Sequence, residues 1–201
     1  MPKIDWKPEI LLQPNIPKPL HQVNPRSILG SSWWNKTRKL AYASTAFHCL
    51  ACGVHKDKAI YRQWLEGHEV YEIDYAKGRL TYLYTAPLCH FCHNFIHDGR
   101  LANLLQQGKI HHHKYAAILK HGDLVLKAAG LRKLSLDDRE REGQRREALG
   151  GLAVWEDWRL ELNGVLYPPK FKNYEEWLEY HTENYREPNT DSLKRFLRID
   201  E

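Results

Sequence analysis

The sequence predicts an α+β fold, and three observations support that prediction. Residues 68–75 and 78–84 read as two strands of a β-hairpin, joined by a turn at Lys77-Gly78. Helical periodicity follows, first from Cys92 to Leu105 and then over residues 111–129. Two Cys-x-x-Cys pairs stand before and after the hairpin. We therefore expect a hairpin-and-helix core tied together by the cysteines, with a mostly helical C-terminal extension.

The segment before this core is rich in proline. Six of the ten prolines lie in residues 2–25, and proline fixes φ and removes a hydrogen-bond donor. We therefore expect an extended arm that packs on the domain through Trp6, Ile10 and Leu11. A helix is expected from Ser31, because serine can cap a helix and apolar residues follow at helical spacing.

The segment after the core mixes helical and apolar stretches. Residues 132–148 are predicted to form an exposed helix of mixed charge. Residues 150–180 are rich in Trp and Tyr, and Pro168-Pro169 predicts a turn between two short apolar elements there.

Composition excludes several classes of protein. A chain of 201 residues with 42% hydrophobic residues, seven Trp and eleven Tyr can bury a core, so it is not wholly disordered. No apolar run approaches the roughly 18 residues of a membrane helix, and the N-terminus lacks the apolar segment of a secretion signal. We therefore expect a soluble, cytoplasmic protein without a membrane partner.

The net charge of +5 is unevenly distributed along the chain. Residues 1–50 hold seven Lys and Arg against two Asp and Glu, a net +5, whereas residues 151–201 hold seven against eleven, a net −4. A basic N-terminal half suits a polyanionic partner such as nucleic acid. Ordinary solvated surface gives the same balance, and charge alone does not decide between the two.

The four cysteines form two close pairs, Cys49-x-x-Cys52 and Cys89-x-x-Cys92. In a reducing cytosol such pairs favour metal-binding thiolates over disulfides. A two-residue gap lets both sulfurs face one tetrahedral ion, so the two pairs predict a closed, structural zinc site. The 36 residues between the pairs must fold as an element inside the loop. The alternative is four buried free cysteines.

Three histidines lie close to these cysteines in sequence. His93 and His97 are four residues apart, and on one face of a helix two such imidazoles can hold a divalent cation. His68, from the first strand, is the expected third ligand, which leaves positions open for water or phosphate. The alternative is that all three are polar surface or helix-capping residues. The expected cation is Mg²⁺, Mn²⁺, Ni²⁺ or Zn²⁺.

The order of these motifs resembles the HNH endonuclease family. The resemblance rests on Cys-x-x-Cys, then Leu-Glu-x-His-Glu ending at Glu69, then Leu-Cys-x-x-Cys-His-x-x-Ile-His ending at His97, and it covers residues 47–101. Family members fold as a β-hairpin followed by a helix, the ββα-metal fold, around one metal ion. Together with the proline content and the helical periodicity, the resemblance leads us to expect three parts: an extended Pro-rich arm (1–30), an HNH-like zinc-containing domain (31–105) and a mainly helical C-terminal region (106–201).

Two positions depart from the family pattern. Glu69 falls where many members have the histidine general base, and Tyr84 falls where many have the asparagine that orients it. Glu69 can act as the base if burial raises its pKa, it can ligate the metal, or it can mark a site that no longer cuts. The sequence leaves these three alternatives open.

The resemblance implies hydrolysis of nucleic-acid phosphodiester bonds, with DNA as the expected substrate. It implies that His68, His93 and His97 bind the cation and that, with Glu69, they are the catalytic residues. Nearby basic residues are expected to hold the backbone: Lys36, Arg38, Lys39, Lys56, Lys58 and Arg62. Trp33 and Trp34 can stack on bases, but we expect them to anchor a helix.

Two other functional classes stay open. The first is a catalytically silent HNH-like zinc module that binds nucleic acid or a protein. The second is a protein-binding adaptor or inhibitor whose interface is the Trp-rich, acidic C-terminal segment. The three histidines favour the endonuclease, whereas the missing histidine base and asparagine favour the other two.

Overall fold

The computed structural model describes residues 4–134 and 151–184. Its centre is the expected hairpin, in which β1 (Leu65–Asp74) pairs antiparallel with β2 (Arg79–Cys89). Gly78 turns the chain with a φ of +62°, a conformation that glycine adopts without strain. A Cβ at Gly78 would lie only 2.8 Å from the Ala153 side chain, so glycine is also required there by space.

Two further strands extend the sheet, where the sequence predicted only short apolar elements. β3 (Arg159–Leu162) lies parallel to β2, and β4 (Val165–Tyr167) returns antiparallel to β3, giving the order β1-β2-β3-β4. Pro168 and Pro169 follow β4 without a regular turn, and the turn between the two short strands lies instead at Asn163-Gly164. Strands of four and three residues are too short to show a clear sequence period. Leu160 pairs with Leu80 of β2 and is buried in the same hydrophobic cluster.

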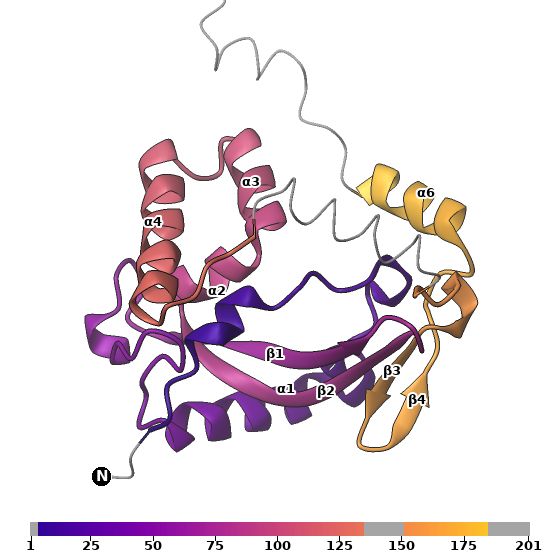
Figure 1. Ribbon diagram of the computed structural model, residues 1–201, viewed down its shortest axis with the longest axis horizontal. Helices are drawn as coiled ribbons and strands as arrows, with labels where there is room; N and C mark the ends of the chain where they lie inside the picture. The colour runs from indigo at the N-terminus through magenta and orange to yellow at the C-terminus, as the bar shows by residue number, and fades with distance from the viewer. Residues whose placement is uncertain (1–3, 135–150, 185–201) are drawn as a thin grey trace, which may run out of the picture.

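Helix α1 (Pro25–Ser44) crosses one face of the hairpin (Figure 1). Asn24 caps it by accepting from the Ser27 N–H at 2.9 Å, and Gly30 interrupts it with φ +81° and ψ 171°. The helical segment after Gly30 begins where the sequence predicted, but the helical turn before it was missed. Trp34 contacts Gly67, where a Cβ would lie 3.1 Å from the indole ring.

Three helices lie on the other side of the hairpin (Figure 1): α2 (His90–Ile96), α3 (Asp98–Gln106) and α4 (His112–Ala128). Helix α4 agrees with the prediction for residues 111–129. The single helix predicted from Cys92 to Leu105 is wrong, because His97 leaves helical geometry with φ −87° and ψ 52° and separates α2 from α3. Most of the helix predicted over 132–148 lies outside the described residues.

The proline-rich arm packs on the core but is not fully extended. It contains two short 3-10 helices, η1 (Pro8–Leu12) and η2 (Lys18–Leu20). Ile10 and Leu11 are buried in the same hydrophobic core as the cysteines, as expected, whereas Trp6 is 42% exposed.

The far end of the sheet has a smaller core of its own around Leu20, Leu80, Trp158 and Leu160. Two more short 3-10 helices occur, η3 (Lys56–Lys58) and η4 (Trp155–Asp157). Helix α6 (Tyr174–Asn184) packs against η2. None of the helices in the described ranges is long and apolar enough to cross a membrane.

Candidate metal centres

The four cysteines come from two tight turns that the fold brings together. In the first, the Cys49 N–H donates to the Val54 carbonyl at 2.9 Å, and Gly53 allows the turn with a φ of +74°. In the second, Cys89 ends β2 and caps α2, its sulfur accepting from the Cys92 N–H at 3.5 Å. The hairpin is thus the element folded between the two cysteine pairs.

The geometry of the sulfurs fits a tetrahedral zinc ion. All four lie within 4.8 Å of one another, and Cys52 Sγ lies 3.8 Å from Cys89 Sγ. A tetrahedron with Zn–S bonds of about 2.3 Å has edges of about 3.8 Å. All four are free cysteines, and three of them are buried. The cluster can therefore bind a metal ion such as zinc.

A cation would also suit these thiols electrostatically. A hydrogen bond with Cys49 lowers the pKa of Cys52 to about 6, while burial raises the pKa of Cys49 itself. Buried thiolates so close together repel one another, so one thiol can ionise only at the expense of its neighbour. A dication would remove this conflict, because it stabilises all four thiolates at once.

His121 of α4 is a neighbour of the cysteine cluster that the sequence analysis missed. Its Nε2 lies 3.4 Å from Cys92 Sγ, and hydrogen bonding to Cys52 and Cys89 raises the pKa of His121 to about 9. A protonated or N–H-donating imidazole there stabilises sulfur-centred negative charge. No local spacing signals it, since His121 is 29 residues from Cys92.

The three predicted histidines converge on a second point. His68 projects from β1, His93 lies in α2, and His97 ends that helix. Their candidate ligand atoms all lie within 4.8 Å of one another, and the His93 and His97 rings are 4.8 Å apart between centroids. These residues can therefore hold a second metal ion.

His68 is the residue whose surroundings fit a cation best. It is 2% exposed, and neither of its ring nitrogens has a hydrogen-bond partner in the described part of the chain. Burial lowers the pKa of His68 to about 2 and that of His97 to about 4, so both present neutral imidazoles. Buried polar side-chain atoms are nearly always paired, and coordination of a metal would satisfy His68.

Glu66 orients His93, and the sequence analysis did not single it out. Its two carboxylate oxygens lie 2.5 Å from His93 Nδ1 and 2.8 Å from His90 Nδ1. Burial by itself raises the pKa of Glu66, but hydrogen bonding to His90 and His93 outweighs this and lowers the pKa of Glu66 to about 2. A carboxylate on Nδ1 leaves the Nε2 of His93 to face an ion. The sequence does carry one signal for Glu66. It stands two residues before His68, so the two side chains share a face of the strand.

Glu69 lies next to His68 but is not among the converging groups. Successive side chains of a strand point to opposite faces, so Glu69 leaves the sheet on the other side from His68. Burial raises the pKa of Glu69, and a backbone hydrogen bond and the charges of His93 and Arg26 offset only part of that rise. Tyr84, opposite Val70 in the hairpin, packs against the hydrophobic core.

The six basic residues expected to hold a nucleic-acid backbone do not gather at one place. Arg38 and Lys56 line a cavity of about 380 Å³. Arg62 lines a second cavity, of about 410 Å³, beside Glu66. The other three, Lys36, Lys39 and Lys58, are exposed and line neither cavity.

Three further cations in the second cavity were missed by the sequence analysis. Arg100 of α3 and Lys109 and Lys114 near the start of α4 lie there with Arg62. They follow the cysteine and histidine motifs in the chain, and only the packing of α3 and α4 brings them beside Glu66.

Comparisons of the chain with protein-family models, with curated proteins and with solved structures give no match. The described structure has an α+β fold with a four-stranded mixed sheet, five α-helices, a four-cysteine cluster and a three-histidine cluster beside a β-hairpin.

Proposed function

We propose that this chain is a metal-dependent, HNH-like endonuclease that hydrolyses phosphodiester bonds of nucleic acid, with DNA as the first substrate to test. The observation that supports it most is the convergence of His68, His93 and His97, with His68 buried and otherwise unpartnered. Four cysteines suited to a structural zinc fix the helix and strand end that position this site.

The chain's own residues supply positioning and charge. Glu66 holds His93 by its Nδ1, and Arg62, Arg100 and Lys109 line the cavity beside Glu66, where they can bind backbone phosphates. A divalent cation bound by the histidines would supply Lewis-acid stabilisation of the scissile phosphate. The resemblance makes Glu69 the candidate that accepts the proton of the attacking water, although its side chain leaves the opposite face of β1 from His68, so Glu69→Gln is a decisive variant in the test.

The test is nicking of supercoiled plasmid by zinc-loaded protein at low salt with Mg²⁺, Mn²⁺, Ni²⁺ or Zn²⁺. Wild-type protein and His113→Ala, an exposed histidine of α4, should nick equally. His93→Ala should not nick, yet should retain one zinc per chain at the cysteines. Glu69→Gln should slow nicking by about 10²–10⁴-fold, the usual contribution of a general base. If folded, zinc-loaded wild-type protein nicks no DNA or RNA with any of these cations, cleavage is refuted.

One observation favours a second candidate, a silent HNH-like module that binds nucleic acid without cutting it. The residue after His68 is Glu69, on the opposite strand face, rather than a histidine. The two candidates share the expectation that binding weakens steeply with salt, because bound phosphates release counterions. Only the endonuclease candidate predicts nicking. If the protein nicks and Glu69→Gln does so at the wild-type rate, the general base is another residue.

A further inference from the structure

Trp64 separates two cavities at the start of β1. It is 49% exposed and lines both of them. We call the first the base cavity, lined by Arg38, Tyr42, Phe47, Lys56, Gln63, Trp64 and Leu65. We call the second the phosphate cavity, and the residues that matter in it are Arg62, Glu66, His90, Arg100, Lys109 and Lys114. Leu65 and Glu66 are consecutive strand residues, so the cavities open on opposite faces of β1.

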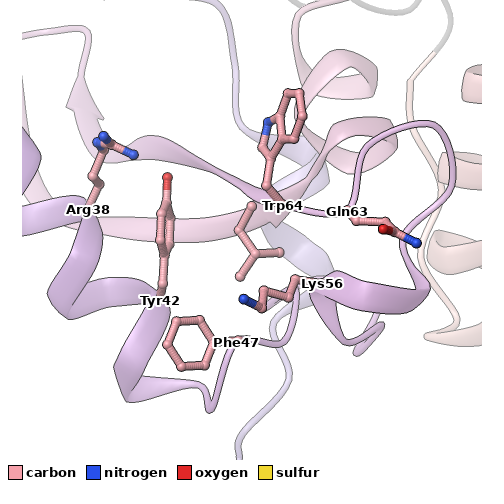
Figure 2. A pocket seen from close by; sticks show the side chains of 7 residues that line it. Arg38, Tyr42, Phe47, Lys56, Gln63 and Trp64 are labelled. Atoms are coloured by element: carbon pink, nitrogen blue, oxygen red, sulfur yellow. The ribbon is translucent and has the colours of Figure 1, made fainter.

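The base cavity combines aromatic walls with cations. In Figure 2, Tyr42 and Phe47 lie on one side and Trp64 on the other, and the Lys56 ammonium points inward between them. Lys56 Nζ lies 4.9 Å from the Phe47 ring centroid, and Phe47 is 42% exposed. The base cavity has a volume of about 380 Å³, which is in the range of small-ligand sites. A ligand that combines a flat aromatic ring with a negative charge would fit these aromatic and cationic walls.

The phosphate cavity lies on the strand face that carries His68. It contains four cationic side chains, and none of the four forms an ion pair with any described residue. The only carboxylate lining it is Glu66, which His90 and His93 already bind. Consecutive phosphates are the ligand that such a charge distribution favours.

We propose that the two cavities together bind an unpaired nucleotide segment, with one base stacked on Trp64 in the base cavity and the neighbouring phosphates in the phosphate cavity. This deepens the proposed function and rests on it, because it assigns the substrate as single-stranded or locally unpaired nucleic acid. A base inside a duplex has both faces covered by its neighbours, so it cannot enter between Trp64 and Phe47. Arg62, whose guanidinium lies 4.7 Å from the Trp64 ring centroid, sits at the junction of the two cavities.

The experiment measures binding of labelled 12-residue oligonucleotides to full-length His93→Ala protein, which keeps strands intact. The probes are single-stranded DNA, single-stranded RNA, duplex DNA, and single-stranded DNA without bases. Single strands should bind about tenfold or more tighter than the duplex and the abasic strand. Trp64→Ala and Phe47→Ala should each weaken single-strand binding by roughly tenfold to a hundredfold, the effect of removing one stacking contact. The DNA and RNA probes decide which sugar is preferred.

One control variant lies outside both cavities, and one further variant tests the phosphate cavity. Tyr174→Ala removes an aromatic residue of equal exposure on α6, at the other end of the molecule, and should change nothing. Lys109→Ala should weaken all the strands that retain phosphates and reduce the salt slope by about one. Because Trp64 is half exposed, its variants should fold. A base stacked on Trp64 should quench tryptophan fluorescence, so Trp64→Phe should retain binding but lose this quenching.

The results separate this inference from the proposed nuclease. Equal binding by His93→Ala protein with and without Trp64→Ala or Phe47→Ala overturns the inference even if wild-type protein nicks plasmid. Tight, Trp64-dependent single-strand binding by a protein that never nicks supports it and refutes cleavage. Absence of binding to every probe at low salt refutes both.

Discussion

Replacing Glu66 by glutamine tests whether the histidine cluster is a metal site oriented by a carboxylate. Glu66 binds His93 with one oxygen and His90 with the other, at 2.5 Å and 2.8 Å. A glutamine side chain has one acceptor oxygen, so it can keep only one of these bonds and presents its NH₂ to the other imidazole N–H. We therefore expect a 10- to 100-fold weaker affinity for the second cation, about 1.4–2.8 kcal/mol, as for other residues that orient metal-binding histidines.

The assay is a competition between the protein and a fluorescent chelator for Mn²⁺ or Co²⁺, after the zinc at the four cysteines has been quantified. Glu72→Gln is the matched control, because Glu72 is an exposed carboxylate on the same strand and should leave the affinity unchanged. A Glu66→Gln protein that is folded and binds the cation within twofold of wild type would refute the role of Glu66. Loss of zinc from the cysteines in this variant would instead show that Glu66 supports the fold.

Three further outcomes follow from the structure. Cys89→Ala should give unfolded or insoluble protein, and elemental analysis should find no zinc in it. The reason is that four-cysteine zinc sites stabilise small zinc peptides by on the order of 10 kcal/mol. A soluble, cooperatively folding variant would contradict this. Gly122→Ala places a Cβ 2.2 Å from the Phe95 ring, so chemical denaturation should show a net loss of about 1–3 kcal/mol despite alanine's better helix propensity; equal stability would mean that Phe95 can move. Burial lowers the pKa of His21, whose Nδ1 accepts from the Trp177 indole. His21 therefore contributes stability above its unfolded pKa of about 6.5, and that contribution is lost as the pH falls through the lowered folded pKa. Tm should accordingly drop less on acidification in His21→Gln than in wild type, and parallel Tm curves would exclude this contribution.

Much of the candidate site could be predicted from the sequence, because its signals are local. Cysteines two residues apart, histidines four apart and a strand-turn-strand pattern each depend on geometry within one short segment. For that reason the hairpin, the helix over 111–129 and the pairing of His93 with His97 could be expected before the fold was seen, whereas the approach of His68 was expected only because a third ligand from a strand would complete the set. The break at His97 was not predictable in this way, because an uninterrupted helix has the same apolar pattern.

The tertiary structure alone decided the features that join distant segments. His121 and Lys109 belong to no motif, and Glu66, although part of the Leu-Glu-x-His-Glu run, acquires its histidine partners only when α2 packs against the hairpin. Strand β3 likewise exists because Leu160 is buried against β2, 80 residues earlier in the chain. Covalent spacing limits which atoms of a segment can meet, so the sequence by itself pointed to the candidate metal ligands. The groups around those ligands were determined by hydrophobic packing between elements, which buries apolar area with little regard to distance along the chain.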